Sequence, residues 1–315
     1  MLSFNEMLLL LNLILLLEYL LGILINTFIA AVLSLDWAKS QHLKSCDGIG
    51  LVIGVSRVVL LSADFGYTLL IIGQPGLYVP VWMDKVYGFI GMFLSFSSFW
   101  FTALLYVYYC AMVATFRQPL FTRLKARIPH LMPRLLLGCF AASLVSALPS
   151  PWAHTDMTIT ISTVNLLHNI SWEDSQSDMK YLHLGIYYAL GYSPPFLIFC
   201  GSAVLLIASL YRHTKRMQRS ASDFNPPRLD AHYRAVKSVV SFFFLFAVYF
   251  AACLCLGMNM MLFGTTGRIL HPVVTEWYPF LHSALLIRNY PKLNQAAARI
   301  IRHAGCWKQI GPSEE

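Results

Sequence analysis

Residues 7–33 read MLLLLNLILLLEYLLGILINTFIAAVL, a run in which Glu18 is the single charged side chain. At a rise of about 1.5 Å per residue, a helix of this length more than crosses the hydrocarbon core of a bilayer. The whole chain is 57% hydrophobic and 12% charged, whereas soluble domains carry about 25% charged residues. The stretch therefore predicts a membrane-spanning helix, and the composition predicts that others follow.

Six more apolar stretches of sufficient length follow along the chain. They lie at about 46–73, 84–115, 134–151, 182–210, 234–262 and 272–290. Pro149 and Pro151 end the fourth span, and Pro194-Pro195 inside the fifth predicts a kink or local unwinding. We expect an all-α membrane protein with a receptor domain of seven transmembrane helices at 7–290.

The orientation follows from the positions of lysine and arginine. The segments 34–45, 116–134, 211–237 and 288–315 hold 19 of the 23 basic residues, whereas the alternate segments hold Lys85, Lys180 and Arg268. Basic loops stay in the cytoplasm. We therefore expect residues 1–6 outside the cell and 291–315 as a cytoplasmic tail. Residues 1–6 lack a basic n-region, so we expect a retained first span and not a secretory signal.

Two modification sites and the redox state are also predicted. Asn169-Ile170-Ser171 is an N-glycosylation triplet in the longest outer loop, about 152–181. None of the seven cysteines falls in an outer segment, so we expect no structural disulfide. Cys306 follows a basic amphipathic stretch and is either a palmitoylation site or a free thiol.

The inner ends of the fifth and sixth spans carry ordered motifs. Residues 205–217 read LLIASLYRHTKRM, and residues 231–242 read AHYRAVKSVVSF. They resemble the LLxSLxxHxxxM and AHxxALKxVxSF signatures of the type 2 (bitter) taste receptors. Similar matches occur at Asn26, at Ser56-Arg57, along 100–128 and at His282-Ser283 followed by PKLNQ at 291–295. An Asp-Arg-Tyr motif after the third span and Asn-Pro-x-x-Tyr in the seventh are absent, which disfavours a rhodopsin-like receptor.

The chain also departs from the family pattern. Met112 stands where the family has Lys, and Asn289-Tyr290 replaces the Gly-Asn before Pro-Lys-Leu. A Trp that many members use for ligand stacking aligns near Gly91. The resemblance thus implies a divergent member whose agonists cannot be transferred from relatives.

Polar residues within the spans are candidates for a switching network. Arg57 lies about ten residues into its helix, where a charge normally faces the bundle interior with a partner. The resemblance implies that Arg57 holds the seventh helix through Ser283, with Asn26 beside it and His282 nearby. Asp64 is seven positions further on the same helical face, which makes it a candidate counter-ion or a bystander.

The resemblance places a ligand pocket in the outer half of the third, fifth, sixth and seventh helices. Tyr249 is implied to be a pivoting aromatic at its floor, and Glu276 either pairs with a cationic ligand or bonds within the bundle. Aromatic side chains more often pack than bind, although a buried Tyr hydroxyl needs a partner. The candidate lining is Met92, Ser95, Phe96, Tyr187, Tyr188, Tyr192, Tyr249, Cys253, Thr275 and Glu276.

The resemblance also implies partners. Small bitter compounds are the expected agonists, and a gustducin-type or inhibitory heterotrimeric G protein would lead to phospholipase C and calcium release. Matching positions at the inner helix ends are Tyr109, His213, Lys215, His232 and Lys237. Residues 292–303 form a basic amphipathic stretch that we expect along the inner leaflet of the plasma membrane. Homo- and hetero-oligomers both stay open.

Three other protein classes fit the sequence less well. A pheromone receptor of the vomeronasal type 1 group shares the architecture, but the motifs at 205–217 and 231–242 disfavour it. A transporter or channel typically shows internal repeats with paired broken helices, and only the fifth span looks broken. No catalytic set, metal-spaced cluster, cofactor motif or nucleic-acid motif is present, so we expect neither an enzyme nor a cofactor-dependent protein.

Overall fold

The computed structural model describes residues 4–41, 44–74, 79–113, 119–153, 176–220 and 226–309. The regular elements in these ranges are all helices, as predicted. They are α1 (Phe4–Ser40), α2 (Ser45–Gly73), α3 (Val81–Val113), α4 (Pro119–Ala147), α5 (Ser150–Ala153), α6 (Gln176–Ser220), α7 (Pro226–Asn289) and α8 (Pro291–Gln309).

Six stretches in the described ranges are long and apolar enough to cross a membrane. They are Leu9–Ser40, Ser45–Leu70, Val81–Met112, His130–Ala147, Gly185–Arg212 and Lys237–Leu254. The predicted seventh span at 272–290 is helical but less apolar, since it carries Glu276, His282 and Arg288. It belongs to α7, which packs against α1 and α6, so its polar side chains have protein neighbours.

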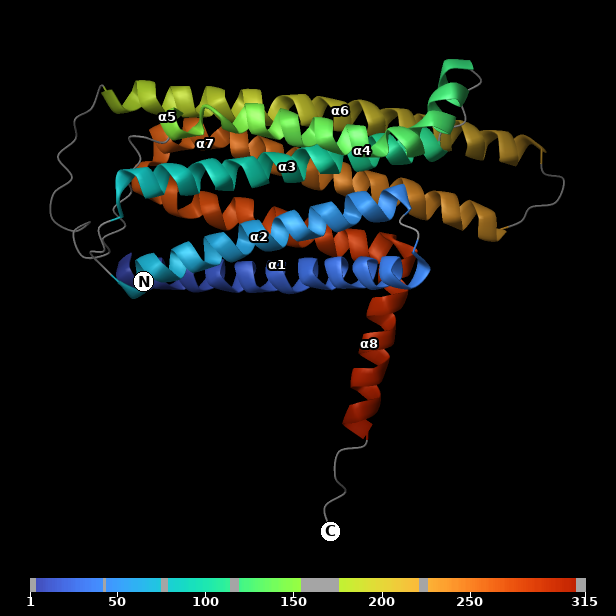
Figure 1. Ribbon diagram of the computed structural model, residues 1–315, viewed down its shortest axis with the longest axis horizontal. Helices are drawn as coiled ribbons and strands as arrows, with labels where there is room; N and C mark the ends of the chain where they lie inside the picture. Colours follow the sequence, from blue (N-terminus) through green and yellow to red (C-terminus); the bar gives the residue numbers. More distant parts are fainter. Residues whose placement is uncertain are drawn as a thin grey trace, which may run out of the picture.

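The last two predicted spans form one helical element that folds back on itself. The ring of Tyr249 lies 4.4 Å from that of Tyr278, and the ring of Phe242 lies 5.1 Å from that of His282. Residues early in α7 thus pair in reverse order with residues late in it. Figure 1 shows both arms of α7, in orange, running along the bundle. Residues 263–271, which connect the two arms, keep a helical backbone.

The structure distinguishes one of the two outcomes expected for the prolines of the fifth span, since it excludes local unwinding but does not test a kink. Pro194 and Pro195 lie inside α6, which continues as helix from Gln176 to Ser220, so no local unwinding occurs. Each proline removes one hydrogen bond from the turn before it. The helix persists because its flanks pack against α3 and α7.

The core lies along α3, which contacts α2, α4 and α6. Phe96, Phe99 and Phe101 of this helix are almost fully enclosed. Many large apolar side chains on the outer faces of α1, α4 and α6 are exposed, such as Leu24, Leu137 and Leu197. A bundle immersed in lipid requires apolar residues both in its core and on its outer faces. α8 projects sideways from the bundle at the end where α7 finishes (Figure 1).

Candidate functional site

An aromatic cluster joins α3, α6 and both arms of α7. Its centre is Phe99, whose ring centroid lies 4.8–5.1 Å from four other rings. These belong to Tyr192, Phe246, Tyr249 and Tyr278. Offset and edge-to-face pairs at these separations are favourable beyond simple burial. The aromatic cluster therefore fixes the relative positions of the helices that the sequence assigned to a ligand pocket.

One outer layer of the cluster combines a hydrogen bond with a close approach of backbone. The hydroxyls of Ser95 and Tyr192 are 2.9 Å apart, which ties α3 to α6. Phe96 packs on Tyr192 at 4.7 Å. A Cβ placed on Gly191 would lie 2.3 Å from the Phe96 ring, so only glycine fits there without movement. Met92 is buried one turn outward from Phe96.

The other predicted pocket residues lie around this layer. Tyr187 stacks edge-on against Phe96 at 5.8 Å, and Tyr188 stacks on Tyr192 at 6.1 Å. Cys253 is buried one turn after Tyr249 in α7, and Thr275 is buried in the returning arm. The ten predicted lining positions thus come from the three helices that meet at Phe99.

Carboxyl groups gather beside this region in α1, α2 and α7. Glu276 is half-buried and lies within electrostatic range of Glu18 and Asp64. Glu18 is only 3% exposed, and its carboxyl group lies near Trp277. Several carboxylates close together in a low-dielectric setting favour a nearby positive charge.

Deeper in the bundle, Arg57 organises a network of uncharged partners. Its Nε donates to Ser98 Oγ at 2.8 Å and its Nη1 donates to Ser283 Oγ at 3.0 Å. Nη1 also lies 2.9 Å from His282 Nδ1, so that nitrogen is the acceptor and the proton of the neutral ring is on Nε2. Ser283 Oγ donates to Asn26 Oδ1 at 2.7 Å. We call Asn26, Arg57, Ser98, His282 and Ser283 the arginine network.

Asp64 is not part of this network. It accepts a hydrogen bond from Tyr87 instead, and the charged group of Arg57 has hydroxyl, carbonyl, imidazole and ring partners. Seven residues correspond to about 10 Å along a helix, so a carboxylate at Asp64 points into a different layer even on the same face. In the described part of the chain Arg57 and Asp64 thus have different partners, and a counter-ion role for Asp64 stays a prediction.

An inner cavity of about 480 Å³ opens below the arginine network. Its walls come from α3, α6, both arms of α7 and the start of α8. The lining residues include Leu105, Tyr106, Tyr109, Leu210, Phe242, His282, Arg288 and Tyr290. His282 therefore joins the arginine network to the cavity.

The predicted partner-facing residues divide into three groups. Tyr109 lines the inner cavity. Lys215 and Lys237 are exposed at the inner ends of α6 and α7. The side chains of His213, His232 and Cys306 lie outside the described part, as does the whole of Asn169.

Sequence reasoning missed several members of these clusters. Phe99 lies one turn from Ser95, so helical spacing from a predicted pocket residue would have found it. Tyr278 contacts Phe99 and also lies under the guanidinium of Arg57, at 5.4 Å. Ser98 is an ordinary serine in a Phe-rich helix, and nothing in the sequence distinguishes it.

Comparisons with known proteins give one consistent result. The family model described as taste receptor protein (TAS2R) matches residues 1–305. The human taste receptor type 2 member 9 is 31% identical over 294 residues, covering 92% of each chain. Taste receptor type 2 member 7 of Papio hamadryas is 30% identical over 286 residues, covering 90% of each chain.

Proposed function

The chain belongs to the type 2 taste receptor family, and from this premise we propose how it detects and reports its ligands. Membership makes it a bitter taste receptor, a G-protein-coupled receptor and not an enzyme. We infer that agonists bind in the outer half around the aromatic cluster. The signal then passes to a gustducin-type or inhibitory G protein, and on to phospholipase C and calcium release.

One observation carries this proposal: a continuous path of contacts leads from the aromatic cluster to the inner cavity. Tyr249 packs on Tyr278, Tyr278 lies against the Arg57 guanidinium, and Arg57 contacts His282. His282 lines the inner cavity. A ligand that changes the packing of Tyr249 therefore has a physical route to the cavity wall.

The chemistry of the outer half favours amphipathic agonists with a positive charge. The aromatic rings supply apolar surface and faces for cation–π contact. Glu276, with Glu18 and Asp64 nearby, offers carboxyl groups on one side that a bound cation would hold in the charged form. A protonated amine bound near Glu276 would offset the cost of enclosing these carboxyl groups.

The mechanism is a shift of population between two packings of the helices. An agonist that binds one packing more tightly raises its share, and by linkage the G protein does the same. We propose that the end of a G-protein subunit enters the inner cavity against Tyr109. The basic side chains of Lys215, Lys237, His213 and His232 would surround it. Residues 1–6 would lie outside the cell at the plasma membrane.

The test is calcium release in cells that express the receptor with a promiscuous chimeric G protein. We expect saturable responses to a panel of small bitter compounds, strongest for amphipathic amines. Tyr249→Ala should raise the EC50 at least tenfold or abolish the response, because it removes a ring at the centre of the contact path. Tyr249→Phe, which keeps the ring, should lose less.

Phe244→Ala is the matched control, since Phe244 lies on the same arm of α7 and is exposed on its outer face. It should reach the surface and respond as the wild type does. Equal responses of Tyr249→Ala and Phe244→Ala at equal surface expression would contradict the proposed pocket. A wild-type receptor at the surface that is silent to every bitter compound would contradict the proposed agonist class.

A further inference from the structure

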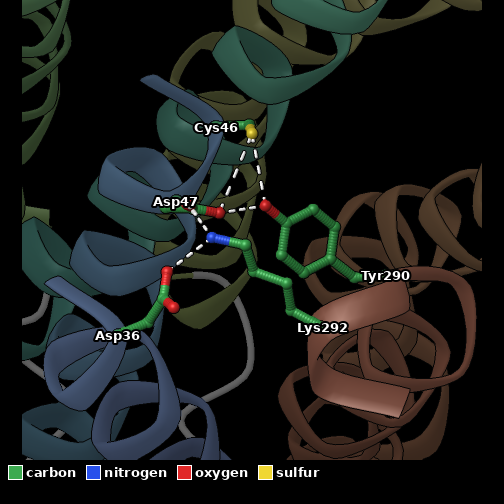
Figure 2. Close-up of polar contacts among 5 residues, drawn as sticks. All are labelled: Asp36, Cys46, Asp47, Tyr290 and Lys292. Atoms are coloured by element: carbon green, nitrogen blue, oxygen red, sulfur yellow. Dashed lines mark hydrogen bonds and ion pairs between the residues drawn. The ribbon is translucent and has the colours of Figure 1, made fainter. Parts of the chain in front are cut away.

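The inner ends of α1 and α2 are tied to the junction of α7 and α8 by a cluster of charged and polar groups. Lys292 Nζ lies 2.5 Å from Asp36 Oδ2 and 2.8 Å from Asp47 Oδ2. The hydroxyl of Tyr290 donates to the other oxygen of Asp47. We call Asp36, Asp47, Tyr290 and Lys292 the inner clamp (Figure 2).

Asp47 is the centre of the inner clamp. It is 2% exposed and lies in the first turn of α2, where the helix dipole favours a negative charge. Its two oxygens take one ion pair and one hydroxyl, so neither is left unsatisfied. Burying a carboxylate without such partners costs free energy, so separating Asp47 from Lys292 and Tyr290 is unfavourable.

Lys292 is the cation that balances this carboxylate. Its side chain is 34% exposed, and it bridges Asp47 to Asp36, which is 42% exposed. Hydrogen bonds to Asp36 and Asp47 raise the pKa of Lys292 above its usual value. Because the pKa is raised, Lys292 stays protonated up to a higher pH than an ordinary lysine does, and it loses its charge only above that pH. The cation is therefore present throughout the cytoplasmic pH range.

Tyr290 belongs to two structures at once. It is the residue between α7 and α8, and its backbone N–H and C=O continue the hydrogen bonding of both helices. Its side chain is held by Asp47, with the Cys46 sulfur 3.3 Å from the hydroxyl. Tyr290 also lines the inner cavity together with Arg288, Asn289 and Pro291. Whatever fixes Tyr290 therefore fixes one wall of the cavity.

The size of the cavity shows why that wall matters. About 480 Å³ is the volume of a small-molecule pocket. A helix with its side chains is about 10–12 Å across, so its tip fits but further turns require the walls to separate. The wall made by Tyr290 and Pro291 is the one attached through the inner clamp to α1 and α2.

We propose that Tyr290 is a positioning residue that, held by Asp47 and Lys292, keeps the inner cavity narrow and so restrains signalling without agonist. This inference rests on the proposed coupling to a G protein. Loosening the clamp should raise the basal activity and leave the agonist site intact.

The experiment combines a functional and a geometric readout on the full-length receptor in lipid nanodiscs. Basal nucleotide exchange is measured with a purified inhibitory-type heterotrimer. The distance from Lys39 to Gln295, two exposed positions on either side of the clamp, is measured by electron paramagnetic resonance. The spin labels are attached through non-canonical amino acids, so the native cysteines stay.

Tyr290→Phe removes only the hydroxyl, and Asp47→Asn keeps the shape of its side chain. Each should raise basal exchange about tenfold or more, as expected for weakening a hydrogen bond to a charged group. The distance distribution should become longer and broader. The double variant should raise basal exchange by less than the two single effects combined, because both changes weaken the contact between Tyr290 and Asp47.

Tyr67→Phe is the matched control. It removes another tyrosine–carboxylate hydrogen bond, from Tyr67 to Asp84 at 3.2 Å, which joins α2 and α3 far from the inner clamp. Its basal exchange and its distance distribution should equal those of the wild type.

An unchanged distance in Tyr290→Phe would overturn the positioning role. A changed distance with unchanged or lower basal exchange would overturn the restraint. A receptor that stimulates no exchange even with a saturating agonist would contradict the proposed function instead. The distance measurement would still test the positioning role of Tyr290 independently.

Discussion

Gly191 shows how a single residue sets the packing of the candidate pocket. The Phe96 ring occupies the space in which any other residue would place its Cβ. This contact joins α6 to α3 directly above the Phe99 centre. No motif marks Gly191, and its role follows only from the position of a ring 95 residues earlier in the chain.

Gly191→Ala should therefore destabilise the receptor, by about 1–3 kcal/mol for an overpacked core position. The melting temperature of the purified receptor is the measurement. Gly201→Ala in the same helix is the control, because a Cβ there meets nothing within 4 Å. An alanine at Gly191 that melts no earlier than one at Gly201 would contradict the packing described for Phe96.

Arg57 is the second residue whose geometry makes a sharp prediction. Its guanidinium donates hydrogen bonds to Ser98 through Nε and to Ser283 through Nη1, and these two serines lie on different helices. A lysine has a single nitrogen and cannot reproduce that fork. Arg57→Lys should reduce agonist-stimulated exchange at least tenfold at equal surface expression.

Arg212→Lys serves as the control for this change, since Arg212 is exposed at the inner end of α6. Its exchange should match that of the wild type. Full activity in Arg57→Lys would show that the arginine network supplies only charge and not geometry.

At the scale of elements, apolar length and basic loops predicted most of the helices. The starts and ends of α2 and α3 agree with the predicted spans within a few residues. The reversal between the sixth and seventh spans was predicted, but the helical backbone of the connection was not, because Gly264 and Gly267 favour a loop. The contacts of the inner clamp were also out of reach, since Lys292 and Asp36 are 256 positions apart.

α8 gives the prediction that belongs to this scale. Ile300 and Ile301 are exposed in the isolated chain, and the basic Arg299 and Arg302 flank them. Such a helix is expected to lie in the interface of an anionic membrane. A fluorophore at Ile301 in nanodiscs should be quenched by spin-labelled lipid about twofold more than one at Gln295.

Equal quenching at Ile301 and Gln295 would place α8 away from the lipid surface. The comparison should be made in nanodiscs with and without anionic lipid, because the basic residues contribute only where the surface is negative.

At the scale of the whole molecule, the alternation of charge predicts one orientation. Asn169 should then meet the glycosylation machinery in the lumen. A glycosidase-sensitive shift in gel mobility is expected for the wild type and should vanish in Asn169→Gln. An epitope at the N-terminus should be labelled on intact cells, and one at the C-terminus only after permeabilisation.

Labelling of the C-terminal epitope on intact cells would contradict this orientation. The family and the seven-helix architecture followed from the sequence because the apolar length, loop charge and ordered motifs extend over nearly the whole chain. The contacts within the aromatic cluster did not, because they depend on how rings from distant segments meet at Phe99.

The partners of Arg57 have a consequence for how the receptor is made. Ser283 and the carbonyl of Pro279 follow Arg57 by 226 and 222 residues. At about 5–20 residues per second, a ribosome needs roughly 10–45 s to synthesise that interval. During this time α2 is in or near the translocon with a guanidinium that costs about 2.5–3.5 kcal/mol at a helix centre. The partners of Arg57 on the last span are therefore missing until that span is synthesised. The fraction of chains that reach the cell surface should depend on whether chaperones or the translocon protect the unpaired guanidinium until then.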